Sequence, residues 1–181
     1  MEKNCLPLTN LPDEMKYCIY AFFALLLLAG CAEEAPREEA SQPESVASAE
    51  VAWLNLEEAL KQQRHRPKPI FIDLYTDWCR WCKVMDQKTF ADPQVAAHLQ
   101  KRFYPVKFNA EKAPPINING KEFKLVSTGR KSLHSLAFAL MKGDISYPSY
   151  VILDDKQQTI SRFKGFRDAQ DFMVELETAL Q

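Results

Sequence analysis

The sequence lacks an excess of charge of either sign. Its 181 residues carry 23 lysines and arginines against 24 aspartates and glutamates. Nucleic-acid-binding proteins usually present a basic surface, so this balance argues against a nucleic-acid partner and gives no hint of an acidic one. The sequence also lacks an internal repeat and a cofactor-binding motif. At this length we expect one domain and some additional sequence.

No apolar run is long enough for a mature transmembrane helix, which needs about 20 apolar residues. The longest run, residues 17–30, follows Lys16 and has the length of a signal-peptide core. A leader that starts at Met15 fits a signal peptide better than one from Met1, because residues 1–14 add three acidic side chains. We therefore expect residues 1–14 to be an over-extended start.

The apolar run ends in Leu28-Ala29-Gly30-Cys31, which resembles the lipobox of bacterial lipoproteins. The resemblance implies cleavage before Cys31 and lipidation of its thiol, so residues 1–30 are predicted to be a lipoprotein signal peptide. A conventional secretory peptide with a chance cysteine is the alternative. Multiple acyl chains would hold the protein firmly on a membrane of the bacterial cell envelope, facing the periplasm or the exterior.

Residues 31–50 are predicted to be a flexible acidic tether, since residues 32–50 hold six glutamates and no large apolar residue beyond Val46. Cys5 and Cys18 would leave with the leader and Cys31 would carry lipid, so Cys79 and Cys82 would be the remaining thiols. The mature chain would have 21 basic and 21 acidic residues.

Residues 51–181 predict one α/β domain. Ile70–Tyr75 is a nearly continuous apolar run, typical of a central strand covered on both faces. Further strands are expected at residues 103–108, 148–153 and 159–163. Helices are expected at residues 57–64, 79–88, 132–141 and 168–180, and a further helix is expected to start at residue 92. Asp92 and Asp168 are the expected N-caps. Residues 113–119 are expected to be a loop, and Asn119-Gly120 a hairpin turn into a strand at 121–126.

Cys79 and Cys82 form a Cys-x-x-Cys pair where the first strand meets a helix. At a helix N-terminus, unpaired backbone N–H groups and the helix dipole stabilise a thiolate, and Arg80 and Lys83 add positive charge. The second cysteine, one turn later, is placed to attack a mixed disulfide and release the substrate. The pair therefore predicts redox chemistry.

Three other readings of the pair are open. A structural zinc site needs four ligands, and the histidines that could join the two thiolates, His65, His98 and His134, lack paired spacing. A c-type haem site needs a histidine where Lys83 stands. An inert buried pair is the third reading, although two tryptophans and two cations favour an exposed reactive loop. We expect no metal and no cofactor.

The stretch Asp73 to Lys83 (DLYTDWCRWCK) resembles the active site of the thioredoxin superfamily, in particular the C-terminal thioredoxin-like domain of the DsbD family of thiol:disulfide interchange proteins. The likeness continues through residues 89–95 (TFADPQV) and at Gly165-Phe166. The resemblance implies a thioredoxin-like fold, with a central mixed β-sheet flanked by helices. A middle segment, residues 111–146, would be an insertion before the cis-proline strand.

The resemblance also implies roles for five residues. Cys79 would be the attacking thiolate and Cys82 the resolving thiol. Asp73 would be the buried acid that takes the proton from Cys82, and burial would raise its pKa; a satisfied polar residue at a strand end is the alternative. Pro148 would be the cis-proline opposite the disulfide, or else an ordinary trans proline, and Tyr147 before it would contact substrate.

Trp78, Arg80 and Trp81 are the other predicted substrate contacts, although the tryptophans could simply cover the loop. Arg80-Trp81 stands where typical thioredoxins have Gly-Pro, so their reduction potential cannot be transferred to this chain. We expect the segment 111–146 to pack beside the active site and shape substrate choice. A surface decoration far from the cysteines is the alternative.

These features predict a membrane-anchored extracytoplasmic thiol:disulfide oxidoreductase, and the resemblance favours one that reduces the disulfides of exported proteins. A membrane thiol reductase is the expected electron donor, because the chain encodes no reducing supply of its own. A monomer is the default expectation. The alternatives are a disulfide oxidase or isomerase, a non-catalytic binding module of the same fold, and metal delivery through the two thiolates.

Overall fold

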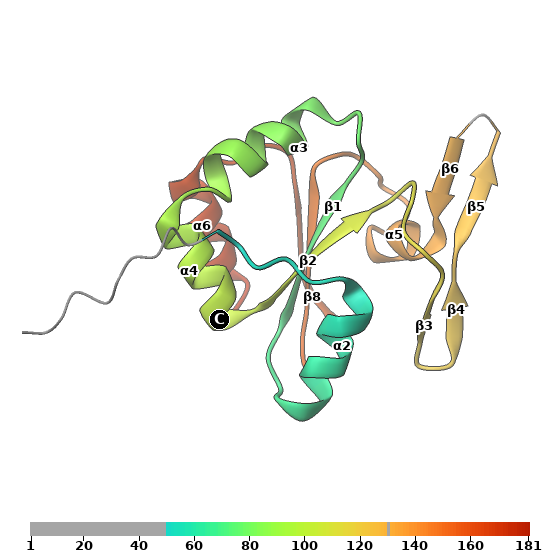
Figure 1. Cartoon of the computed structure of the whole chain (residues 1–181), viewed down its shortest axis with the longest axis horizontal. Coiled ribbons are helices and arrows are strands. Elements are labelled where there is room, and N and C mark those ends of the chain that lie inside the picture. The colour runs from blue at the N-terminus through green and yellow to red at the C-terminus, as the bar shows by residue number, and fades with distance from the viewer. Residues whose placement is uncertain (1–49, 130) are drawn as a thin grey trace, which may run out of the picture. The chain divides into compact units, whose positions relative to one another are not determined.

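The computed structural model describes residues 50–129 and 131–181 (Figure 1). Within these ranges, no helix combines the length and the apolar character that crossing a membrane requires. The predicted signal peptide, the lipidation site Cys31 and nearly all of the tether lie outside the described residues. These three assignments stay predictions.

Four strands form a mixed sheet in the order β2–β1–β7–β8. They are β1 (Ile70–Tyr75), β2 (Tyr104–Asn109), β7 (Ser149–Leu153) and β8 (Thr159–Lys164). The central strand β1 runs parallel to β2 and antiparallel to β7, and β8 is antiparallel to β7. All four strands were predicted from the sequence to within one residue at each end. The buried apolar run of β1 explains its central position.

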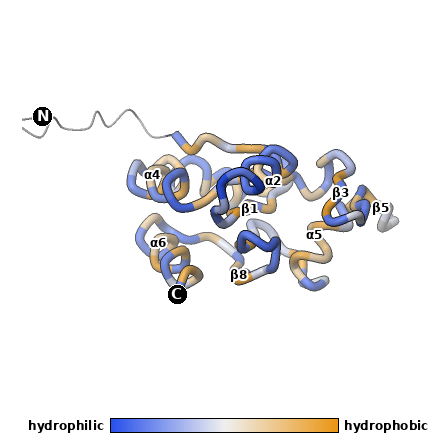
Figure 2. Tube along the Cα trace, turned by 90° about the horizontal axis from the view of Figure 1, so that it is seen from below, coloured by the Kyte–Doolittle hydropathy of each residue, from blue (hydrophilic) through white to orange (hydrophobic). Residues whose placement is uncertain are grey.

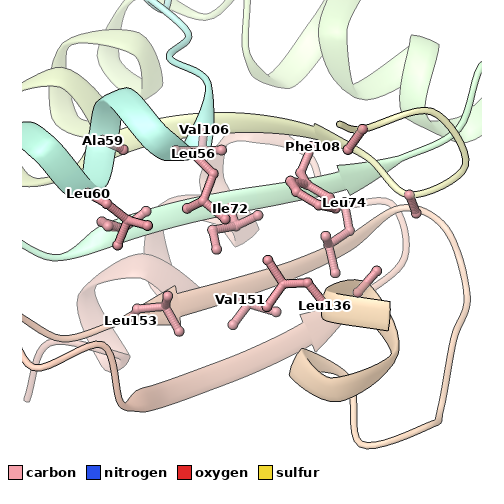
Figure 3. Packing of buried hydrophobic residues seen from close by; sticks show 14 of the residues in the cluster. Leu56, Ala59, Leu60, Ile72, Leu74, Val106, Phe108, Leu136, Val151 and Leu153 are labelled. Carbon is pink, nitrogen blue, oxygen red and sulfur yellow. The ribbon is translucent and has the colours of Figure 1, made fainter. Parts of the chain in front are cut away.

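Helices cover both faces of this sheet (Figure 1). Helices α2 (Leu56–His65) and α5 (Ser135–Leu140) pack on one face, where Leu56, Ile72 and Val151 belong to one buried cluster (Figure 3). Helices α4 (Pro93–Arg102) and α6 (Ala169–Thr178) pack on the other, around an aromatic cluster that includes Phe71 and Phe172. In Figure 2 these helices alternate between hydrophilic and hydrophobic segments, as expected for helices that bury one face.

The helix N-termini are fixed by side chains that accept backbone N–H groups. Asp92 accepts from Gln94 at 2.8 Å and caps α4, with Pro93 in its first turn, and Asp168 caps α6. Both caps were predicted. Asn55 caps α2 in the same way, accepting from Glu58 at 2.8 Å. Each such cap typically contributes about 1 kcal/mol to stability.

The helix predicted at residues 79–88 is divided in two. Helix α3 (Arg80–Val84) begins after Cys79, and a π-helix, η2 (Met85–Thr89), continues it. The wider turn is closed by the bond from the Phe90 N–H to the Met85 carbonyl at 2.9 Å. Single π-helical turns are often found at functional sites, and no simple sequence pattern predicts them.

The middle segment departs most from prediction. The expected loop at 113–119 ends in a strand, β3 (Ile116–Ile118), and the expected strand at 121–126 is two strands, β4 (Lys121–Phe123) and β5 (Leu125–Thr128). The helix expected from residue 132 begins only at Ser135, because β6 (Lys131–His134) pairs with β5. The Asn119-Gly120 turn was correct: both residues have positive φ and join β3 to β4.

His134 explains why the helix starts late. Its side chain is buried, and its Nδ1 accepts the Leu136 N–H at 3.2 Å, which makes it the N-cap of α5. Its Nε2 lies 3.2 Å from the Pro114 carbonyl, and its ring packs edge-to-face on Phe108 with centroids 5.0 Å apart. Burial lowers the pKa of His134, consistent with a neutral ring that donates through Nε2. His134 therefore links the start of α5 to Pro114 and to Phe108 of β2.

Candidate active site

Cys79 and Cys82 are joined by a disulfide at the start of α3. Cys79 is the N-cap residue, and the Cys82 N–H donates to its sulfur at 3.1 Å. The Cys79 N–H in turn donates to the Thr76 carbonyl at 3.1 Å. A hydrogen bond to the sulfur would stabilise a thiolate at Cys79 after reduction, because bonds to the charged form lower a pKa. The arrangement suits Cys79 to be the nucleophile.

Asp73 lies on β1, on the same face as Phe71, against which Met85 of η2 packs. It is 1% exposed, and its Oδ2 accepts from the Lys107 Nζ at 2.7 Å. Burial raises the pKa of Asp73 to about 6; Lys107 opposes this and Asp86 adds to it. The predicted burial and raised pKa are therefore confirmed, while the proton-transfer role stays a proposal.

Lys107 and Asp86 belong to the same charge network, although neither was predicted from the sequence to be a site residue. Lys107 lies opposite Asp73 in the β1–β2 register and also pairs with Asp86 of η2. Burial opposes its charge, but the two carboxylates outweigh that effect and raise the pKa of Lys107. Lys107 is the only charged residue of β2. A single charge in an otherwise uncharged strand was the sequence feature that could have indicated its role.

Pro148 follows a cis peptide bond after Tyr147, and it is buried directly before β7. Its carbonyl accepts the Gly165 N–H at 2.9 Å, which ties the β7 entrance to the loop after β8. The Tyr147 ring packs edge-to-face on Trp78 with centroids 5.8 Å apart. Burial, with Glu111 nearby, raises the pKa of Tyr147 to about 12, so the phenol is neutral.

Two exposed tryptophans stand next to the cysteines. Trp78 is 59% exposed and Trp81 is 56% exposed, whereas Cys79 is only 3% exposed. Trp81 packs against Phe166, which follows β8, with centroids 5.5 Å apart. Phe166 was part of the sequence likeness but was not named as a site residue. The disulfide is thus recessed beside two aromatic pairs, Trp78–Tyr147 and Trp81–Phe166.

The first residues of the middle segment form polar contacts with the two residues that precede Cys79. Trp78 donates its Nε1–H to Glu111 at 2.9 Å. Asp77 accepts from Asn109 at 2.8 Å and pairs with Lys112 at 2.5 Å. The segment therefore does contact the active site through its first residues. Its hairpins instead pack on the α2 and α5 face, where Ile116, Ile118, Phe123 and Leu133 border the core.

The histidines considered as zinc ligands lie on different elements: His65 ends α2, His98 is on α4, and His134 ends β6. Across residues 50–129 and 131–181, no group of three histidines, cysteines, aspartates or glutamates is close enough to hold a metal ion.

Comparison with known proteins places the chain in a family. Residues 37–163 match the model of the Thioredox_DsbH family, described as protein of unknown function DUF255. A relative is the thiol:disulfide interchange protein DsbD of Pectobacterium atrosepticum, 29% identical over 113 residues, or 61% of this chain. That match takes in 16% of the length of DsbD.

Solved structures support the fold. A DsbH oxidoreductase superposes with a TM-score of 0.56 at 18% identity, covering 79% of this chain and 93% of the other. A thioredoxin from Thermus thermophilus superposes with a TM-score of 0.54 at 21% identity, covering 72% and 88%. The predicted thioredoxin-like fold is therefore confirmed. The chain belongs to the DsbH/DUF255 family of thioredoxin-like proteins and is homologous to DsbD.

Proposed function

We propose that the protein is a lipid-anchored reductant that reduces disulfides of exported proteins outside the cytoplasm. The observation that carries the proposal is the Cys79–Cys82 disulfide, which lies where β1 meets α3 with the buried acid Asp73 on the same strand. Homology to a thiol:disulfide interchange protein supports the same chemistry.

In the proposed reaction, the Cys79 thiolate attacks one sulfur of a partner disulfide. A mixed disulfide forms between Cys79 and that sulfur, and the other partner sulfur leaves as a thiolate and takes up a proton. Cys82 then loses its proton and attacks the Cys79 sulfur. The partner leaves with two thiols, and the Cys79–Cys82 disulfide is restored with two electrons transferred.

Asp73 would accept the Cys82 proton in the second step. A carboxylate with a pKa of about 6 is ionised at neutral pH, yet it is a better base than an exposed aspartate. Lys107 holds Oδ2, whereas Oδ1 has no hydrogen-bond partner among the described residues. We propose Oδ1 as the proton acceptor.

Anchoring through Cys31 and the acidic tether would keep the domain close to a membrane while it meets its partners. Residues 1–30 would be the leader, with Met15 as the true start, and 51–181 the working domain. The oxidised pair needs two electrons per cycle, which we assign to a membrane thiol reductase. Cytoplasmic thiols are kept reduced by soluble systems, so an anchored reductant is useful on the outer side of a membrane.

A trapping experiment tests this mechanism. The Cys82→Ser variant is made in a chain whose Cys5, Cys18 and Cys31 are replaced by serine, and it is mixed with a disulfide-bonded peptide. It is expected to accumulate a mixed disulfide between Cys79 and one cysteine of that peptide. Removing the resolving thiol blocks the second step and leaves the first intact. Intact mass and peptide mapping identify the adduct. Absence of an adduct would favour the binding-module alternative, in which the pair is structural.

A further inference from the structure

The first turn of α3 carries two cations on one face. Arg80 and Lys83 are three residues apart, a spacing that places helical side chains side by side. Both are exposed, and among the described residues neither forms an ion pair. The pKa of Asp77 is lowered chiefly by its hydrogen bond to Lys112, and the charge of Lys83 adds to that effect.

The nearby carboxylates are already engaged. Asp77 pairs with Lys112 and accepts from Asn109, and Asp86 pairs with Lys107. The surface around the disulfide therefore offers two cations that form no ion pair among the described residues, with Glu111 nearby against Trp78, although the mature chain is predicted to be neutral overall. This positive charge is local, and the total composition does not reveal it.

An apolar pair adjoins the cations. Trp81 lies between Arg80 and Cys82 in the chain and packs against Phe166, which is 36% exposed. Cys79 is recessed, so a partner sulfur has to reach it past exposed rings. A flat folded surface would meet these rings before its sulfur reached Cys79, which favours a partner disulfide on an extended segment.

We propose that the partner disulfide lies on an extended acidic segment, with carboxylates that meet Arg80 and Lys83 and an apolar side chain that rests on Trp81 and Phe166. This inference rests on the proposed function and adds the substrate class. The reduced pair converts the segment's disulfide to two thiols and becomes a disulfide itself, so atoms and electrons balance without another reactant.

Three synthetic peptides test the proposal. Each contains the same intramolecular disulfide and one phenylalanine, and the residues flanking the cysteines are glutamates, glutamines or lysines. The full chain with serine at positions 5, 18 and 31 is reduced, freed of reductant and mixed with each peptide. We expect the glutamate peptide to react about tenfold faster than the lysine peptide at low salt, with the glutamine peptide between them. The ratio should fall to about twofold in 0.5 M salt because of screening.

The variant Arg80→Gln/Lys83→Gln should reduce the glutamate-to-lysine ratio to about two. The ratio is the correct readout because a change in thiolate reactivity affects all three peptides alike. Lys101→Gln/Arg102→Gln, at the end of α4, removes the same charge from an exposed site away from α3 and should leave the ratio unchanged.

The outcomes separate the two claims. If no peptide is reduced, the proposed function fails. If all three are reduced at equal rates, or the lysine peptide is fastest, the function stands and the acidic-partner inference is wrong. An equal loss of preference in the Lys101→Gln/Arg102→Gln variant would also overturn it, because the preference would then reflect total charge.

Discussion

Replacing Cys79 by serine is expected to lower the rate of disulfide reduction roughly 1,000-fold or more, since the hydroxyl is not ionised at neutral pH. Cys79 is the N-cap of α3, and its sulfur accepts the Cys82 N–H. Serine can keep this bond, so the local structure should persist without the nucleophile. The measurement is the appearance of thiols from a protein disulfide that is reduced stoichiometrically by the pre-reduced chain.

Cys82→Ser is the matched control, because it removes the same disulfide and also replaces one cysteine sulfur by oxygen. It should still attack the substrate, at a rate within about tenfold of the unmodified chain, and then stop at the mixed disulfide. Equal loss of the first step in both variants would contradict the assignment of Cys79 as nucleophile. Retained reduction in Cys79→Ser would show that the chemistry lies elsewhere.

Replacing Asp73 by asparagine is expected to stabilise the oxidised protein while slowing its chemistry. Burial raises the pKa of Asp73 from 3.8 to about 6, which corresponds to about 3 kcal/mol against the ionised form. A carboxyl whose folded pKa is raised contributes full stability below pH 4 and loses it as the pH rises to about 6. The gain from asparagine should therefore be absent at pH 4 and complete at pH 8.

This figure already includes the attraction of Lys107, which keeps Asp86 as a partner in the variant, so the gain should be about 3 kcal/mol or less at pH 8. Denaturant unfolding at pH 4 and pH 8 measures it. Asp155→Asn, at an exposed position between β7 and β8, is the control and should change little at either pH. A loss of stability at pH 8 in Asp73→Asn would show that the Lys107 pair outweighs the burial of charge.

The same substitution should slow resolution of the mixed disulfide about 100-fold at neutral pH, the scale of a lost general base. The rate should recover as the pH becomes alkaline, since a thiol then ionises without the help of a base. Formation of the mixed disulfide by Cys79 should change much less. A uniform slowing of both steps at every pH would point to a structural role for Asp73.

The sequence predicted the sheet and the redox pair because their signals are local. The apolar run of β1 leads directly into Cys79, and the caps at Asp92 and Asp168 are read from single residues. The middle segment was misread because Leu133, Leu136 and nearby apolar residues fit helical spacing. What delays the start of that helix to Ser135 is the burial of His134 against Phe108 and Pro114, a tertiary contact that a local pattern does not contain.

The charge network of Asp73, Lys107 and Asp86 is a second feature that the sequence could not predict. Asp73 could be named from its place before the cysteines, but Lys107 is 34 residues away and meets it only through the β1–β2 register. Asp86 joins them from η2. Phe166 likewise reaches Trp81 from beyond β8. Such partners are far apart in the sequence and meet only when the chain folds. Local sequence patterns predict the strands and helices but not these contacts between them.

The reduction potential of the Cys79–Cys82 pair distinguishes a reductant from a disulfide donor. The chain with serine at positions 5, 18 and 31 is equilibrated in thiol–disulfide buffers of known potential, and the oxidised fraction is determined after acid quenching. A reductant should give about −270 mV, the value of thioredoxin. A value near −120 mV, the strongly oxidising end of the range, would contradict the account and make the protein a disulfide donor.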